Sequence, residues 1–164
     1  LAQLVGDYAP KRVVALGDSF HDIDADQRFS EADCDLLNAI VDRAEEFIWI
    51  LGNHDPDIPD CVRGRREDHA QIGGFLMTHH PYDPGADGVN LCGHYHPKLR
   101  VSVKTGKVSG PCFAVSAERI ILPSFGTFTG GLNVDHPDFK AALPGAIRYH
   151  MVKGDKVYRF DGAR

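Results

Sequence analysis

The sequence lacks several features that would place it in a special class of protein. No hydrophobic run approaches the ~18 to 20 residues that a membrane helix needs, and no basic-then-apolar leader opens the chain. No internal repeat or low-complexity segment is visible. The 43% hydrophobic and 25% charged residues instead indicate a soluble globular protein. The 164 residues fit one domain, 1–164.

Cysteine patterns and excess positive charge are also missing. Cys34, Cys61, Cys92 and Cys112 include no C-x-x-C pair. A chain of this length does not need disulfide staples, so we expect reduced thiols in a cytoplasmic protein. The formal net charge is −5, which argues against general electrostatic attraction to nucleic acid. A nucleic-acid substrate would need a local basic patch or metal ions.

The first half of the chain alternates short apolar runs with a helical pattern. The runs at 13–16, 47–51, 75–78 and 89–92 are typical of buried strands. Ser30 and Asp33 match a capping box, and apolar residues at helical spacing follow it. The segment 55–73 holds Pro56, Pro59 and three arginines, so we expect a loop there.

The second half changes to antiparallel β-structure. Short strands are expected at 100–104, 112–115, 119–122, 147–152 and 156–160. Gly154-Asp155 between the last two is a good hairpin signal. At the other end, Leu1–Val5 reads as the last turns of a helix that Tyr8-Ala9-Pro10 ends. We therefore expect the natural start of the chain to be missing.

Each of the four apolar runs of the first half ends in a polar residue that can bind a metal. Because functional groups gather beyond the carboxyl ends of parallel strands, these side chains would converge if the strands are parallel neighbours. Imidazole, carboxylate and amide oxygen suit manganese, iron, zinc or nickel. The absence of thiolate ligands argues against a structural zinc site. The residues concerned are Asp18, Asn53, His79, His94 and His96.

In order, the motifs resemble those of the calcineurin-like metallophosphoesterase superfamily. The matching segments are Gly17-Asp18, Gly52-Asn53-His54-Asp55, His79 and Gly93-His94-Tyr95-His96. The resemblance implies an α/β fold, a four-layer α/β/β/α sandwich of two mixed sheets flanked by helices. It also implies two divalent ions; Mn²⁺ is the expected metal, with Fe, Zn or Ni as alternatives.

The same resemblance implies a role for each residue. Asp18 would bridge the two metals, and His96 would bind one of them. Asn53, His79 and His94 would hold the other, with His79 chosen over His80 because of its place in the His-x-Pro pattern. His54 would face the phosphate and stabilise or protonate the leaving oxygen.

Two further resemblances indicate which members of the superfamily the sequence is most similar to. Gly17-Asp18-Ser19-Phe20-His21 resembles the signature of the superfamily's double-strand-break repair nucleases, where the histidine assists catalysis. The resemblance therefore implies that His21 assists catalysis here; the alternative is a turn residue bonded to Asp22. Pro111-Cys112-Phe113 and the segment 122–131 resemble the PdeM-type, ligase-associated DNA-damage-response phosphoesterases of bacteria. In that segment Phe125, Thr129 and Gly130 are candidates for substrate binding; a tight glycine turn is the alternative.

One departure is serious. The superfamily's first motif, Asp-x-His, supplies further ligands for the metal that His96 binds, and it is absent from this sequence. We expect that an N-terminal segment with the first strand was lost; the alternative is a one-metal or metal-free relative. Without that strand, its neighbour becomes the exposed edge of a sheet.

The function expected from these features is metal-dependent hydrolysis of phosphodiester bonds. A metal-activated hydroxide would attack phosphorus, and DNA is the expected substrate, as for a repair nuclease or phosphodiesterase. Ligase-associated repair proteins are the partners that the resemblance implies, and no membrane is involved. The alternatives are a small-molecule phosphodiesterase or phosphatase, and a non-catalytic scaffold with a degraded metal site. Arg63, Arg65 and Arg66 either contact phosphates or form a solvated loop.

Overall fold

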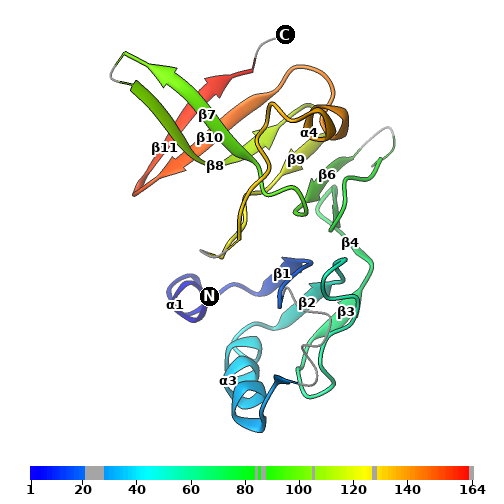
Figure 1. Ribbon diagram of the computed structural model, residues 1–164. Helices are drawn as coiled ribbons and strands as arrows, with labels where there is room; N and C mark the ends of the chain where they lie inside the picture. The colour runs from blue at the N-terminus through cyan, green and yellow to red at the C-terminus, as the bar shows by residue number, and fades with distance from the viewer. Residues whose placement is uncertain (21–27, 84, 86–87, 105, 127–128, 163–164) are drawn as a thin grey trace. The chain divides into compact units, whose positions relative to one another are not determined.

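The computed structural model of the chain describes residues 1–164 except 21–27, 84, 86–87, 105, 127–128 and 163–164 (Figure 1). The chain forms two compact units, Leu1–Ala70 and Gln71–Arg164, which we describe separately. Among the described residues, every helix is too short or too polar to cross a membrane.

The first unit is built on a three-stranded parallel sheet in the order β1-β2-β3. Strand β1 lies at the edge of this sheet, with Leu16 beside Ile50 of β2. The predicted capping box starts α3: the Ser30 hydroxyl accepts a hydrogen bond from the Asp33 amide, and the Asp33 carboxylate accepts one from the Ser30 amide. The elements are α1 (Ala2–Tyr8), β1 (Arg12–Leu16), α3 (Glu31–Val41), β2 (Glu46–Ile50) and β3 (Arg65–Glu67).

The core of the first unit lies around Trp49. Trp49 shares a buried cluster with Phe47, Val41, Ile58 and Val62, and its ring centroid lies 4.4 Å from that of Phe47. The indole N–H donates a hydrogen bond to the Arg63 carbonyl. The segment that follows β2 is therefore packed into the core, although it contains few regular elements.

A disulfide joins Cys34 of α3 to Cys61, whose Cα atoms lie 5.8 Å apart. The prediction of four reduced thiols is therefore wrong for this pair, and it holds for the buried Cys92 and Cys112. The two bonded cysteines are 27 residues apart, so no local pattern announces the bond. Only the packing of α3 against the segment after β2 brings them together.

The second unit contains a mixed sheet in the order β11-β10-β8-β9-β6-β5-β4, and β7 pairs with β8 beside it. Strands β5, β6 and β9 run parallel, whereas β8, β10 and β11 are antiparallel to their neighbours. The elements are β4 (His69–Ile72), β5 (Phe75–Thr78), β6 (Val89–Cys92), β7 (Lys98–Val103), β8 (Gly106–Val115), β9 (Arg119–Ile121), α4 (Pro137–Ala142), β10 (Arg148–Lys153) and β11 (Lys156–Asp161).

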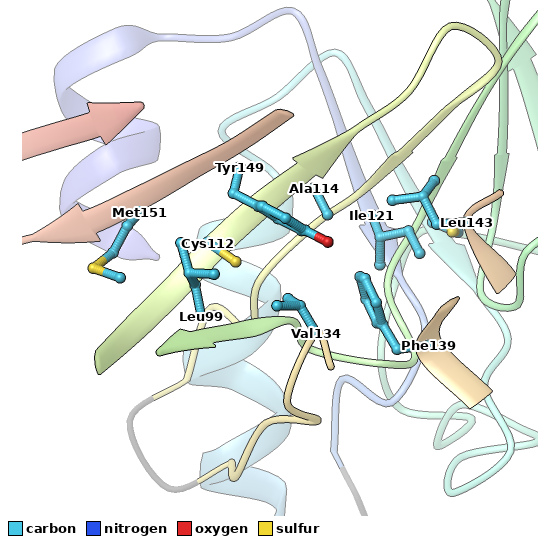
Figure 2. Packing of buried hydrophobic residues seen from close by; sticks show 10 residues of the cluster. Leu99, Cys112, Ala114, Ile121, Val134, Phe139, Leu143, Tyr149 and Met151 are labelled. Atoms are coloured by element: carbon cyan, nitrogen blue, oxygen red, sulfur yellow. The ribbon is translucent and has the colours of Figure 1, made fainter. Parts of the chain in front are cut away.

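One face of this sheet is covered by apolar side chains. Figure 2 shows Phe139, at α4, near Ile121 of β9, with Tyr149 of β10 and Ala114 of β8 beside them. Phe139, Ala114 and Ile121 are fully buried. The alternation along β8 and β10 therefore directs every second side chain into this core and the others away from it.

The predicted α/β fold with two sheets is confirmed, and two details need correction. The smaller sheet is wholly parallel, not mixed. The predicted loop 55–73 contains β3 and β4; their short, arginine-rich or polar sequences gave no strand pattern. The four-layer stacking stays a prediction.

Candidate metal centre

The Asp18 loop of the first unit is locked to the loop that follows β2. Because β1 and β2 are parallel, both chains leave the sheet at the same edge. The Asp55 carboxylate accepts hydrogen bonds from the amides of Asp18 (2.7 Å) and Phe20 (3.1 Å). In return, Asp18 Oδ1 accepts one from the His54 amide at 2.9 Å. Each loop thus holds backbone amides of the other through a carboxylate side chain.

Gly52 makes this close approach possible. A Cβ atom at this position would lie 2.2 Å from Asp18 Oδ1 and 2.5 Å from Asp55 Oδ1. The requirement for glycine is therefore steric, since no larger residue leaves room for the two carboxylates. Gly52 opens the Gly52-Asn53-His54-Asp55 motif, and the structure shows the contact that this glycine permits.

Asp55 is a residue that the sequence analysis did not assign. Its side chain is only 1% exposed. Burial raises its pKa above the ordinary value, and the neighbouring Asp18 carboxylate acts in the same direction. The amide hydrogen bonds from Phe20, Asp18 and Ser19 oppose that shift because they favour the charged carboxylate. Asp55 is thus a buried anchor for the Asp18 loop.

Three histidines converge in the second unit. The ligand atoms of His79, His80 and His94 all lie within 4.8 Å of one another. His94 Nδ1 is 3.2 Å from His79 Nε2, and the His80 and His94 ring centroids are 4.0 Å apart. His79 is buried, His94 half-buried and His80 exposed. In the described part of the chain this is the group that could hold a metal ion.

The parallel pair β5 and β6 positions these histidines. Thr78 ends β5 beside Cys92 at the end of β6, so the two polar segments leave the sheet together. The Gly93 amide then donates a hydrogen bond to the His79 carbonyl at 3.2 Å. Polar groups therefore lie together beyond β5 and β6, and others do so beyond β1 and β2 of the first unit. The four predicted strands form two parallel pairs in two sheets, not one set of neighbouring strands.

Asn90 supports the histidine segment from inside the sheet. Its side chain is fully buried and donates hydrogen bonds to Thr78 Oγ1 (2.8 Å) and the Leu76 carbonyl (3.0 Å). The Thr78 hydroxyl donates in turn to the His80 carbonyl. The Asn90 carbonyl oxygen accepts from Arg119 Nε and the Tyr82 amide. Such outer contacts orient ligands in metal sites, and sequence reasoning missed them.

The structure brings some of the predicted residues together. His79 and His94 lie close to each other, and His80, which the sequence analysis set aside in favour of His79, joins them. His96 is not in that group. Asp18 and Asn53 belong to the first unit, where Asn53 is exposed. His21 lies outside the described residues.

Three of the predicted ligands share an unusual backbone. Asp18, His94 and His96 have φ values of 51°, 34° and 45°. The only other described residue besides glycine with positive φ is Ala9, which ends α1. Left-handed backbone at such residues costs free energy, and it concentrates at functional sites. This geometry marks the three positions independently of the sequence motifs.

The glycine-rich segment supports the His94–His96 turn. The Leu132 amide donates to the Tyr95 carbonyl at 3.1 Å, and the Lys98 amide donates to the Leu132 carbonyl at 2.8 Å. A Cβ atom on Gly131 would lie 2.5 Å from the His96 carbonyl oxygen. Among the candidates for substrate binding, Phe125 is 71% exposed, Gly130 is exposed and Thr129 is half-buried. Their role stays a prediction.

The arginines of 63–66 have structural partners. Arg63 pairs with Asp42, and Arg65 pairs with Glu46 and Glu67. The Arg66 guanidinium donates to the carbonyls of Ile58, Pro59 and Val62. Arg63 and Arg65 are exposed to solvent as well as paired, and contact of these arginines with phosphates stays a prediction.

Comparison with known proteins shows the fold. No family model and no curated protein matches the chain. Among solved structures, the chain is similar to the one titled "Crystal structure of Pseudomonas putida nuclease MPE". The TM-score is 0.70 and the sequence identity is 23%, over 96% of this chain and 75% of that chain.

Proposed function

We propose that this protein is a metal-dependent phosphoesterase that cleaves the phosphodiester bonds of nucleic acid, with DNA as its substrate. The convergence of His79, His80 and His94 is the observation that carries the proposal. The similarity of the fold to that of a nuclease supports the choice of substrate class. The strained backbone at Asp18, His94 and His96 further supports a functional role for these positions.

The donor set of the second unit fits a divalent transition metal. Three imidazole nitrogens, one of them from the exposed His80, are the kind of ligands that zinc, manganese, iron and nickel accept. Three protein ligands leave coordination positions for water or substrate. Such an ion polarises phosphoryl oxygens and lowers the pKa of bound water. In this proposal His79, His80 and His94 hold the ion.

The other predicted residues keep the roles that the sequence suggests. Asp18, Asn53 and His96 are proposed as further metal ligands. His54 is exposed, as a group that meets substrate must be, and it is proposed to donate a hydrogen bond or proton to the leaving oxygen. Asp55 and Asn90 are proposed as positioning residues, since Asp55 accepts a hydrogen bond from the Asp18 amide and Asn90 accepts one from the Tyr82 amide. A role in DNA repair, with ligase-associated partners, belongs to the same proposal.

The test is metal binding and hydrolysis by the full chain. The purified protein is stripped with a chelator, reloaded with Mn²⁺, Fe²⁺, Zn²⁺ or Ni²⁺, and its metal content is measured. Hydrolysis is then compared on a model phosphodiester, a phosphomonoester, single-stranded DNA and nicked DNA. We expect bound metal and cleavage of DNA; a preference for small esters would favour the small-molecule alternative.

His94→Ala tests the histidine group directly. Loss of a ligand should lower metal content and cut turnover by more than about 100-fold. His150→Ala, in β10, is the matched control, because this half-buried histidine lies outside the cluster. If the unmodified protein neither retains metal nor hydrolyses any of these substrates, the result supports the scaffold alternative.

A further inference from the structure

The charge of the chain is divided unevenly between its two units. Leu1–Ala70 has seven Lys and Arg against sixteen Asp and Glu. Gln71–Arg164 has eleven against seven. The net charge of −5 for the whole chain therefore hides a positive second unit. Within it, the 30 residues 88–117 contain four cations and no acidic residue.

These four cations lie on the β7–β8 ribbon, the two-stranded antiparallel pair that follows the His94–His96 turn (Figure 1). In its register, Arg100 is opposite Ser109 and Ser102 is opposite Lys107. Directly opposed residues project from the same face of a sheet. Lys98, at the start of β7, shares this face.

The burial pattern confirms which face is outside. Leu99 is 5% exposed and belongs to the core, and Val101 and Val108 pack against that core. The alternating residues of both strands, Lys98, Arg100, Ser102, Lys107 and Ser109, are all exposed. Lys104, at the end of the ribbon, is exposed as well. One face of the ribbon thus combines three cations with two hydroxyl groups.

Several cations elsewhere in the chain are neutralised by acidic partners. Arg12, Arg63 and Arg65 of the first unit all form ion pairs. In the second unit Lys140 and Arg159 also have acidic partners. Within the described ranges, no ion pair involves any of the four cations of the ribbon. They are available to a ligand without first breaking an internal contact.

We infer that the outer face of the β7–β8 ribbon binds the phosphate backbone of a nucleic acid. Exposed Lys and Arg with interspersed hydroxyls are the groups that contact phosphates, and a two-stranded ribbon is narrow enough for a duplex groove. A polyanion matches the charge of this surface, whereas an ordinary mixed-charge protein surface does not. The inference rests on the proposed function for its choice of ligand. It adds a binding surface outside the histidine cluster.

The experiment measures binding separately from cleavage. A fluorescein-labelled 20-nucleotide DNA, single-stranded or duplex, is titrated with the full chain in the presence of a chelator, and anisotropy gives Kd at several salt concentrations. The test variant replaces Arg100, Lys104 and Lys107 with glutamine. We expect its Kd at 0.1 M salt to rise about tenfold or more. On duplex DNA, the plot of the logarithm of the association constant against the logarithm of the salt concentration should become less steep, its negative slope shrinking in magnitude by about 2.7.

The control removes the same charge elsewhere in the second unit. The triple variant Lys140→Gln, Lys153→Gln and Lys156→Gln should keep the original salt slope. Equal weakening by both variants, or no weakening by the ribbon variant, would overturn the inference. So would tighter binding of the unmodified protein to phosphatidylserine vesicles than to DNA.

Thermal unfolding of the variants shows whether they are folded. If the ribbon variant unfolds, single substitutions Arg100→Gln and Lys107→Gln replace it, each expected to lower the slope by about 0.9. Because chelator is present, a failed hydrolysis assay does not affect this result. Failure of the proposed function and failure of the ribbon site are therefore distinguishable.

Discussion

The amide of Asp18 donates a 2.7 Å hydrogen bond to the buried carboxylate of Asp55, 37 residues further along the chain. This bond connects the loops that follow two parallel strands, and both loops carry predicted ligands. Gly52 lies against both carboxylates, and a residue with a side chain would not fit at this position. The arrangement of these two loops therefore depends on the hydrogen bonds of the Asp55 carboxylate and on the absence of a side chain at Gly52.

The first prediction concerns this contact. In Gly52→Ala the new methyl group would overlap Asp18 and Asp55, and its nearest neighbours are backbone and buried carboxylate atoms that cannot easily move. We expect a loss of about 1–3 kcal/mol in the free energy of unfolding and a marked loss of hydrolysis. Denaturant unfolding and a turnover assay measure the two effects.

Gly6→Ala is the matched control for that substitution. Gly6 lies within α1, and its added Cβ would meet only Arg43, at an ordinary distance of 3.7 Å. Alanine favours helix over glycine, so this variant should be as stable as the original or more so. Equal stability of Gly52→Ala and the original chain would show that the two loops can separate without cost.

A second prediction uses two glycines of the same loop. Gly131→Ala would push against the His96 carbonyl at 2.5 Å, whereas a Cβ on Gly130 meets nothing within 4 Å. We expect Gly131→Ala to lower metal binding and stability, and Gly130→Ala to leave stability nearly unchanged. If the two variants unfold at the same temperature, the packing of this loop on the His94–His96 turn is not important for folding.

A third prediction concerns the thiols. Burial raises the pKa of both Cys92 and Cys112 to about 12. Native protein should therefore resist a thiol reagent at pH 8, unfolded protein should show two thiols, and unfolded and reduced protein four. Four thiols without reduction would mean that Cys34 and Cys61 are not bonded.

The same thiols predict how stability depends on pH. Their folded-state pKa lies above the ordinary value, so the unfolded chain loses these protons first. The stabilisation is complete below about pH 9 and is lost as the pH rises towards 12. Cys92→Ala with Cys112→Ala should flatten this part of the stability curve, as measured by denaturant unfolding.

Much of the fold follows from local patterns. Apolar runs of four or five residues located β1, β2, β5 and β6, and the polar residues after them marked the candidate site. Two sheets were expected, but the assignment of each strand to one of them did not follow, because nothing in a short apolar strand says which neighbour it pairs with. For the same reason, the motifs could place Asp18 and His94 at strand ends but could not say what lies beside them.

Parts of the candidate site depend on tertiary contacts that leave no sequence signal. His80 follows His79 directly, and only the observed turn brings both rings to His94. Asn90 is a polar residue in an otherwise apolar strand, which was the one available sign of its buried hydrogen-bond network. Asp55 was visible in its motif, but its burial and bonds to the Asp18 loop were not.

The left-handed backbone at His96 allows a test that separates folding from function. His96→Gly and His96→Ala remove the same side chain, but only glycine relieves the strain at a φ of 45°. We expect the glycine variant to be the more stable by roughly 1 kcal/mol, while both lose metal affinity. Thermal unfolding and metal titration of the pair measure this; equal stability would argue against strain at this position.

That geometry has a consequence for how the sequence can change over time. At Asp18, His94 and His96, a substitution by glycine would stabilise the fold, because glycine adopts the left-handed backbone without strain. A carboxylate and two imidazoles at three such positions therefore cost the fold stability that glycine would restore. A related chain that does not need these three side chains should carry glycine there and still keep its core.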